Sequence, residues 1–169
     1  MKKLIQRGLQ MTGLVDRLQP LLLLAARLYV SLIFFRAGVL KIADWSSTLV
    51  LFRETYKVPV LAPELAAYVG TFGELAFPVM IALGLAGRLG AAGLFVVNVM
   101  AVASYLDLFG FECPAGINSH YYWGSILLAL TVFGPGKISL DELILQRFGL
   151  KRARLAARES AVVVPPRHA

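Results

Sequence analysis

Residues 21–40 read LLLLAARLYVSLIFFRAGVL, a run of twenty residues that contains only two charged side chains. A helix needs about 20 consecutive apolar residues to cross the hydrocarbon core of a bilayer. Further apolar runs cover residues 65–86, 89–108 and 117–133, the last of them short. The sequence therefore predicts an all-α fold, an integral membrane four-helix bundle.

The composition supports the same class. Of 169 residues, 58% are hydrophobic and 16% are charged, whereas a soluble domain has about a quarter of its residues charged. A core of this size cannot hold so many apolar side chains, so lipid must solvate some of them. We expect three parts: a segment at 1–19, a membrane domain at 20–134 in which Pro20 opens the first span, and an amphipathic helix and tail at 135–169.

The basic residues indicate how the bundle is oriented. Four of the 17 Lys and Arg residues precede Pro20 and seven follow Phe133, while the loop between the first two spans holds two and the loop between the last two holds none. Basic residues concentrate in the cytoplasmic segments of membrane proteins. We therefore expect both termini in the cytoplasm. The net charge of +7 then belongs to membrane flanks, and nucleic acid is not an expected partner.

Two segments outside the spans carry a recognisable pattern. The loop at 43–64 contains Trp45, Phe52 and Tyr56, which predicts a short interfacial helix or lid. After the last span, Ser139 and Glu142 have the spacing of a capping box. This box predicts a basic amphipathic C-terminal helix that lies on the inner leaflet.

One face of the first span carries charges at both ends. Arg27, Ser31, Phe34, Gly38 and Lys41 follow one another at helical spacing, so they share a face. Ionisable groups inside a bilayer are costly and usually face the protein interior. The small residues on this face should let a neighbouring helix pack closely.

Polar residues also occur in the middle of the second and third spans, at Glu74 and Asn98. An unpaired carboxylate is costly there, so we predict a buried Arg27–Glu74 ion pair near the midplane, with hydrogen bonds from Asn98. Such a pair could fix helix order, or it could anchor a quinone headgroup or relay protons. Independent, water-exposed residues are the third alternative.

A second polar group is predicted at the outer face. Asp107 should lie at the depth of Lys41 and could pair with it, while Glu112, Cys113 and His120 lie in or near a loop that contains Gly and Pro. Their spacing matches no metal motif, and a structural zinc site usually needs four ligands, so no metal is expected. Cys113 is the only cysteine. It could be a reactive thiol or an intermolecular disulfide partner, but an unreactive interfacial cysteine is the simpler interpretation.

The chain resembles the DoxX family of small four-helix membrane proteins. Three pieces carry the resemblance: the first span from Arg27 to Lys41, then Glu74 followed by the stretch GLAGR at 84–88, and the stretch GPGKISLD at 134–141. The resemblance implies a bacterial-type inner membrane location and membership of redox complexes, since the family is named after a subunit of a thiosulfate:quinone oxidoreductase. It points to Arg27, Lys41 and Glu74 as the functional residues.

We therefore expect a membrane subunit of a quinone-linked redox assembly, at most a non-catalytic or quinone-site subunit, with no catalytic residue assigned. Quinone is the expected ligand, no cofactor is covalently bound, and the electron carrier belongs to a partner subunit. The lipid bilayer is the surrounding partner, and a homo-oligomer remains open. Two alternatives are a structural or assembly protein that recruits a soluble partner and, less favoured, a small permease.

Overall fold

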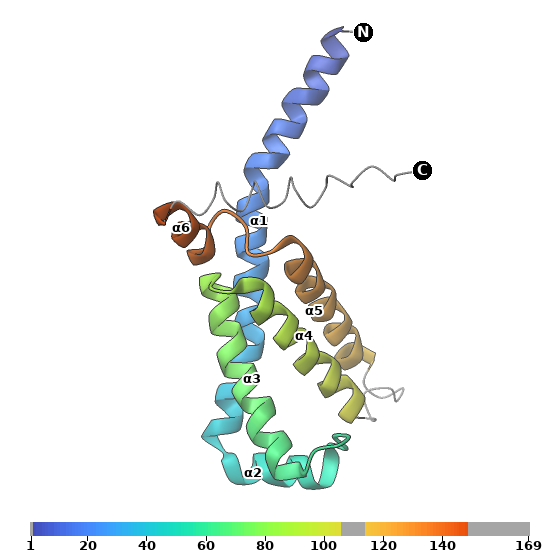
Figure 1. Ribbon diagram of the computed structural model, residues 1–169. Helices are drawn as coiled ribbons and strands as arrows, with labels where there is room; N and C mark the ends of the chain where they lie inside the picture. Colours follow the sequence, from blue (N-terminus) through green and yellow to red (C-terminus); the bar gives the residue numbers. More distant parts are fainter. Residues whose placement is uncertain (1, 106–113, 149–169) are drawn as a thin grey trace, which may run out of the picture.

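The computed structural model describes residues 2–105 and 114–148, and these residues form helices and connecting turns without a strand (Figure 1). The elements in chain order are α1 (Lys2–Ala43), α2 (Trp45–Val50), the π-helix η1 (Leu51–Thr55), α3 (Pro63–Leu83), α4 (Gly87–Ser104), α5 (Pro114–Phe133) and α6 (Leu140–Arg147). The predicted all-α class is thereby confirmed.

Four long helices form the body of the fold. Helix α1 packs against α3 and α5, and α4 packs against α3 and α5, so the four helices enclose one core. Buried side chains from all four helices meet there, among them Phe34, Ile81, Leu94 and Leu127. Elements α2 and η1 lie at one end of the bundle, which we call the cap end. Helix α6 lies at the opposite end, which we call the α6 end (Figure 1).

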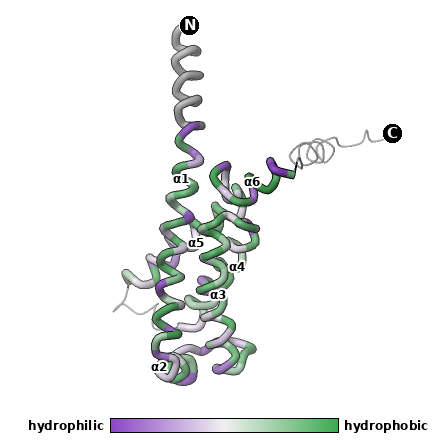
Figure 2. The backbone as a smooth tube through the Cα atoms, turned by 90° about the vertical axis from the view of Figure 1, so that its left-hand side faces the viewer, coloured by the Kyte–Doolittle hydropathy of each residue, from purple (hydrophilic) through white to green (hydrophobic). Residues whose placement is uncertain are grey.

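Among the described residues, three helices are long and apolar enough to cross a membrane, at 17–43, 63–83 and 87–104. Helix α5 is of similar length but carries Asn118, Ser119 and His120 in its first half. The exterior is strongly apolar: Leu22, Leu40, Phe72 and Leu89 each expose about two thirds or more of their surface. Figure 2 shows hydrophobic residues over most of the bundle. Contiguous apolar surface of this kind marks contact with a membrane or a partner.

The prediction that Pro20 begins the first helix is wrong. Helix α1 starts at Lys2 and runs through Pro20, and its first half projects beyond the bundle (Figure 1). A proline inside a helix removes one backbone hydrogen bond, but residues 2–19 are rich in Leu, Gln, Lys and Arg, which have high helix propensity. The helix therefore continues on both sides of the proline.

The loop at 43–64 contains the predicted short helix. Asp44 caps α2 by accepting a hydrogen bond from the Ser47 N–H at 3.0 Å. The chain continues into η1, where Phe52 is buried against Ala66 and Ala67 of α3. This packing holds α2 and η1 against the cap end (Figure 1).

After η1 the chain passes through a strained residue. Val60 has a φ of 73° and is fully exposed. A β-branched residue in the left-handed region costs about 1–3 kcal/mol. We expect Val60→Gly to raise the free energy of unfolding by about 0.5–1 kcal/mol after the entropic cost of glycine, measured by thermal unfolding in detergent. Leu61→Gly, at a neighbour with negative φ, should lower it, and the same sign for both variants would contradict the strain argument.

Candidate functional site

Arg27 is buried at the α6 end and is bound by backbone carbonyls. Its Nε donates to the Ile81 carbonyl at 2.8 Å, and its Nη2 donates to the Ala82 carbonyl at 2.6 Å. Its Nη1 donates to the carbonyls of Pro135 and Ile138 at 2.8 and 2.6 Å. The guanidinium thus satisfies carbonyls at the end of α3 and joins them to the segment between α5 and α6.

Asp141 completes this connection from the other side. Its carboxylate accepts hydrogen bonds from the N–H groups of Ala86 and Gly87 at 2.8 and 3.0 Å, and its own N–H donates to the Gly84 carbonyl at 3.0 Å. The side chain acts as the cap that α4 lacks in its own sequence, because Ala86 is the N-cap residue. A carboxylate at a helix N-terminus is also favoured by the helix dipole. We call this set of contacts by Arg27 and Asp141 the clasp.

The N-cap residue of the predicted capping box, Ser139, is confirmed. Its Oγ accepts from the Glu142 N–H at 3.2 Å and donates to the Gly136 carbonyl at 2.7 Å. Helix α6 then runs for eight residues to Arg147 with Leu143 and Phe148 exposed. The basic residues predicted beyond it lie outside the described part of the chain.

The predicted Arg27–Glu74 pair is wrong. Glu74 pairs with Lys41, with 2.6 Å between Nζ and Oε2. Arg27 lies beside Ile81 and Ala82, which are at least seven residues from Glu74, or about 10 Å along the helix axis. The two groups are therefore at different depths. The shared face of α1 is as predicted, because Arg27, Ser31, Phe34 and Gly38 are buried and Lys41 is largely so.

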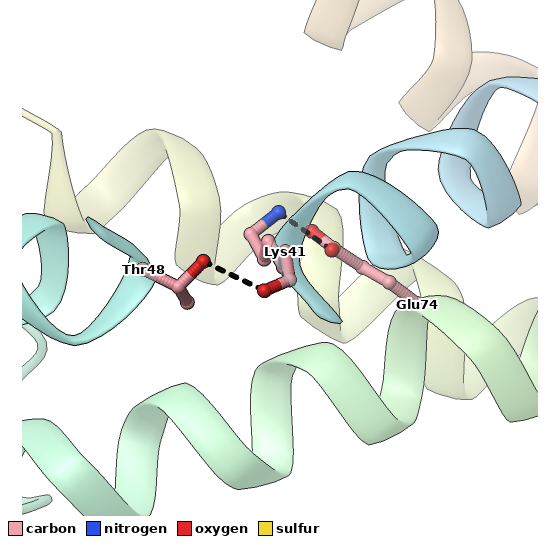
Figure 3. Close-up of polar contacts among 3 residues, drawn as sticks. All are labelled: Lys41, Thr48 and Glu74. Atoms are coloured by element: carbon pink, nitrogen blue, oxygen red, sulfur yellow. Dashed lines mark hydrogen bonds and ion pairs between the residues drawn. The ribbon is translucent and has the colours of Figure 1, made fainter. Parts of the chain in front are cut away.

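The Lys41–Glu74 pair lies near the cap end, between α1 and α3 (Figure 3). The side chains of Lys41 and Glu74 are 17% and 11% exposed. The Thr48 hydroxyl donates to the Lys41 carbonyl at 3.0 Å and so ties α2 to the end of α1. Close packing is required here, since a Cβ on Gly38 would come within 2.9 Å of the Leu75 side chain.

A double-mutant cycle should separate this pair from a surface pair. We expect a coupling of about 2 kcal/mol between Lys41→Met and Glu74→Gln, because burial strengthens the interaction. The Arg53–Glu64 pair, with side chains 50% and 48% exposed, should couple by less than about 1 kcal/mol. Thermal unfolding of the four variants of each cycle measures both values, and equal couplings would contradict the buried pair.

Aromatic side chains pack together at the cap end, near the Lys41–Glu74 pair. Tyr56 packs edge-on against Phe52 and Tyr105, with ring centroids 5.0 and 5.7 Å apart. Burial, and after it the negative charge of Glu74, raises the pKa of the Tyr56 hydroxyl. The Lys57 N–H donates to the Ser104 carbonyl at 2.8 Å, which fastens this segment to the end of α4.

Asn98 does not hydrogen-bond to Glu74 or Arg27, contrary to the prediction. Its Nδ2 donates to the His120 carbonyl at 3.1 Å, and its Oδ1 lies 2.8 Å from the His120 Nδ1. His120 contacts Trp123, which in turn contacts Phe34. This polar contact joins α4 to α5 and is separate from the Lys41–Glu74 pair.

The remaining candidates of the predicted outer group are Asp107, Glu112 and Cys113, which lie outside the described residues. The predicted Lys41–Asp107 pair therefore stays a prediction, although Lys41 already binds Glu74. Within residues 2–105 and 114–148, no group of three His, Cys, Asp or Glu side chains could hold a metal ion. Arg36, the other charged residue of the apolar run at 21–40, is exposed on α1.

Comparisons with known proteins agree with this architecture. The family model described as DoxX matches residues 22–106. The chain is 33% identical over 132 residues to the inner membrane protein YphA of Escherichia coli. The matched region covers 73% of this chain and 90% of that protein. No solved structure matches the chain.

Proposed function

This chain belongs to the DoxX family of integral membrane proteins, and on that premise we propose that it is a subunit of a membrane redox assembly whose quinone site is the Lys41–Glu74 pair. We also propose a bacterial inner membrane location, because the relative in Escherichia coli is an inner membrane protein. Electrons would come from a redox centre on a partner subunit.

The proposed topology has four spans with both termini in the cytoplasm. Helix α5 is the fourth span, since it packs beside α4 and α1 as a full member of the bundle. Arg17, Arg88 and Arg147 lie toward the α6 end, whereas Arg53 and Lys57 lie at the cap end. The positive-inside rule then places the cap end on the periplasmic side.

The observation that carries the proposal is the ion pair between Lys41 and Glu74, largely buried in an apolar bundle. Such residues are expensive in a membrane and mark ligand or proton sites. Reduction of a quinone takes up two electrons and two protons. An ammonium group can donate a hydrogen bond to a quinone oxygen, and a carboxylate can hold and pass a proton. Lys41 and Glu74 provide both groups 2.6 Å apart.

Arg27 has a different role in this proposal. The N–H donors of its guanidinium are largely used, because four hydrogen bonds go to backbone carbonyls. Few N–H donors of Arg27 remain to bind a quinone headgroup, so the clasp is structural. The second candidate function, an assembly protein that recruits a soluble partner, rests on this clasp and on the exposed apolar residues of α6.

A quinone titration of the full chain in nanodiscs tests the proposed function. We expect saturable binding to the wild type and a dissociation constant at least tenfold higher for Glu74→Gln and Lys41→Met, because an ion pair that binds the headgroup is lost. Arg53→Gln and Glu64→Gln, which alter an exposed pair in the same region, serve as controls and should bind as the wild type does. Wild type that binds no quinone would favour the assembly protein.

A further inference from the structure

A groove of about 450 Å³ opens on the exterior of the bundle between α1 and α3, beside α2. Its lining is mostly apolar and carries no charged side chain: Ile42, Trp45, Tyr68, Thr71, Phe72 and Leu75. Several of these side chains are exposed on the apolar exterior, including Ile42, Tyr68 and Phe72. The groove therefore faces the lipid in a membrane-embedded bundle.

One polar atom in this groove has no partner. Thr71 is 3% exposed, and its Oγ1 makes no hydrogen bond. Hydroxyls in helices commonly bond to the carbonyl four residues earlier, as Ser104, Ser125 and Thr131 do here at 2.6–2.8 Å. A buried hydroxyl without a partner costs about 1–3 kcal/mol. A ligand oxygen in the groove would remove this cost.

The groove also lies next to the ion pair. Thr71 precedes Glu74 by three residues on α3, which places the two side chains about one helical turn apart on neighbouring positions of one face. Ile42 directly follows Lys41 on α1. Lys41 and Glu74 do not line the groove themselves, but each wall carries the residue that follows one of them in the chain, Ile42 on α1 and Leu75 on α3.

The lining defines the kind of ligand. Without a basic residue the groove does not suit a phosphate headgroup, which Lys and Arg bind. Trp45 and Tyr68 lie with ring centroids 4.7 Å apart, and aromatic side chains of this kind favour contact with a flat ring. The ligand should thus be a neutral, lipid-soluble molecule with a ring that carries oxygen atoms.

We propose that this groove is the lateral opening through which such a ring-headed lipid reaches the Lys41–Glu74 pair from the bilayer, with the Thr71 hydroxyl donating a hydrogen bond to a ring oxygen. This inference rests on the proposed function, since it takes the ion pair as the ligand site. The chain itself transfers no electron in this step. It binds and orients the headgroup.

Two substitutions test the groove, and each has a matched control. Thr71→Val removes the hydroxyl at nearly constant volume. Ser31→Ala removes a second hydroxyl that is buried without a partner, in a smaller groove of about 210 Å³ between the same helices. Ile42→Trp fills the opening, and Val96→Trp adds the same bulk on the exposed side of α4. The probe is a ubiquinone with one isoprene unit, titrated in nanodiscs.

We expect the dissociation constant to rise about three- to tenfold in Thr71→Val, the worth of one hydrogen bond, and at least as much in Ile42→Trp. Ser31→Ala and Val96→Trp should stay within twofold of the wild type. If Ile42→Trp does not fold, photolabelling by an azido-quinone replaces it and should mark the segments of Trp45 and Tyr68. Labelling elsewhere would contradict the groove.

The outcomes separate the two proposals. Loss of binding in Glu74→Gln together with unchanged binding in Thr71→Val and Ile42→Trp would overturn the groove and leave the proposed function standing. Wild-type affinity in Glu74→Gln, or no binding to the wild type, would overturn the proposed function and this inference with it.

Discussion

Arg27→Met should lower the free energy of unfolding by about 3–5 kcal/mol, the range found when one partner of a buried charged network is removed. The methionine fills much of the same volume but donates no hydrogen bond. The carbonyls of Ile81, Ala82, Pro135 and Ile138 would then lose their donor, and the attraction between Arg27 and the Asp141 carboxylate would be lost. Thermal and SDS unfolding followed by circular dichroism measures the loss.

Two further arginine variants test the same prediction more closely. Arg36 lies on the same helix but is exposed, so Arg36→Met should change the free energy of unfolding by no more than about 0.5 kcal/mol. Arg27→Lys should fall between the wild type and Arg27→Met, because a compact ammonium group cannot match the fork of a guanidinium. Equal stability of Arg27→Met and Arg36→Met would contradict the clasp.

Gly84→Ala should lower the free energy of unfolding by about 2–4 kcal/mol. Gly84 ends α3 with a φ of 67°, and a Cβ there would lie 2.5 Å from the Ser139 Cβ and 2.8 Å from the Arg27 Nη2. The left-handed backbone costs an alanine about 1 kcal/mol, and overpacking adds about 1–3 kcal/mol. The same unfolding measurement applies.

Gly70→Ala is the matched control within the same helix. A Cβ at Gly70 meets only the Phe52 ring at 3.6 Å, an ordinary contact. Alanine inside a helix is favoured over glycine by about 0.5–1 kcal/mol, so this variant should be as stable as the wild type or more so. A loss in Gly70→Ala as large as that in Gly84→Ala would refute the argument from close approach.

Local features of this fold could be predicted from the sequence because they depend on nearby residues. The shared face of α1, from Arg27 to Lys41, follows from helical spacing alone, and the capping box at Ser139 depends on a residue three positions later. Apolar runs predicted the long helices to within a few residues at most ends. The start of α1 was missed because Pro20 is a strong signal for a helix start that the propensity of residues 2–19 overrides.

The pairing of the buried charges could not be predicted in the same way. Whether Glu74 meets Arg27 or Lys41 depends on the register between α1 and α3, which is set by close packing at Gly38 against Leu75. Matching charges by depth alone placed Arg27 at the midplane, whereas its partners are carbonyls at the end of α3. Asp141 was also missed as a helix cap, because it caps α4 from a distance of 54 residues in the chain.

We propose that two cations on one face of α1 have different roles: Arg27 forms the clasp, whereas Lys41, with Glu74, binds the ligand. The most direct test is the quinone dissociation constant of Arg27→Lys and Glu74→Gln in nanodiscs, measured at a temperature where both variants are folded. We predict affinity within threefold of the wild type for Arg27→Lys and a loss of at least tenfold for Glu74→Gln. Loss of affinity in folded Arg27→Lys with wild-type binding in Glu74→Gln would contradict the account.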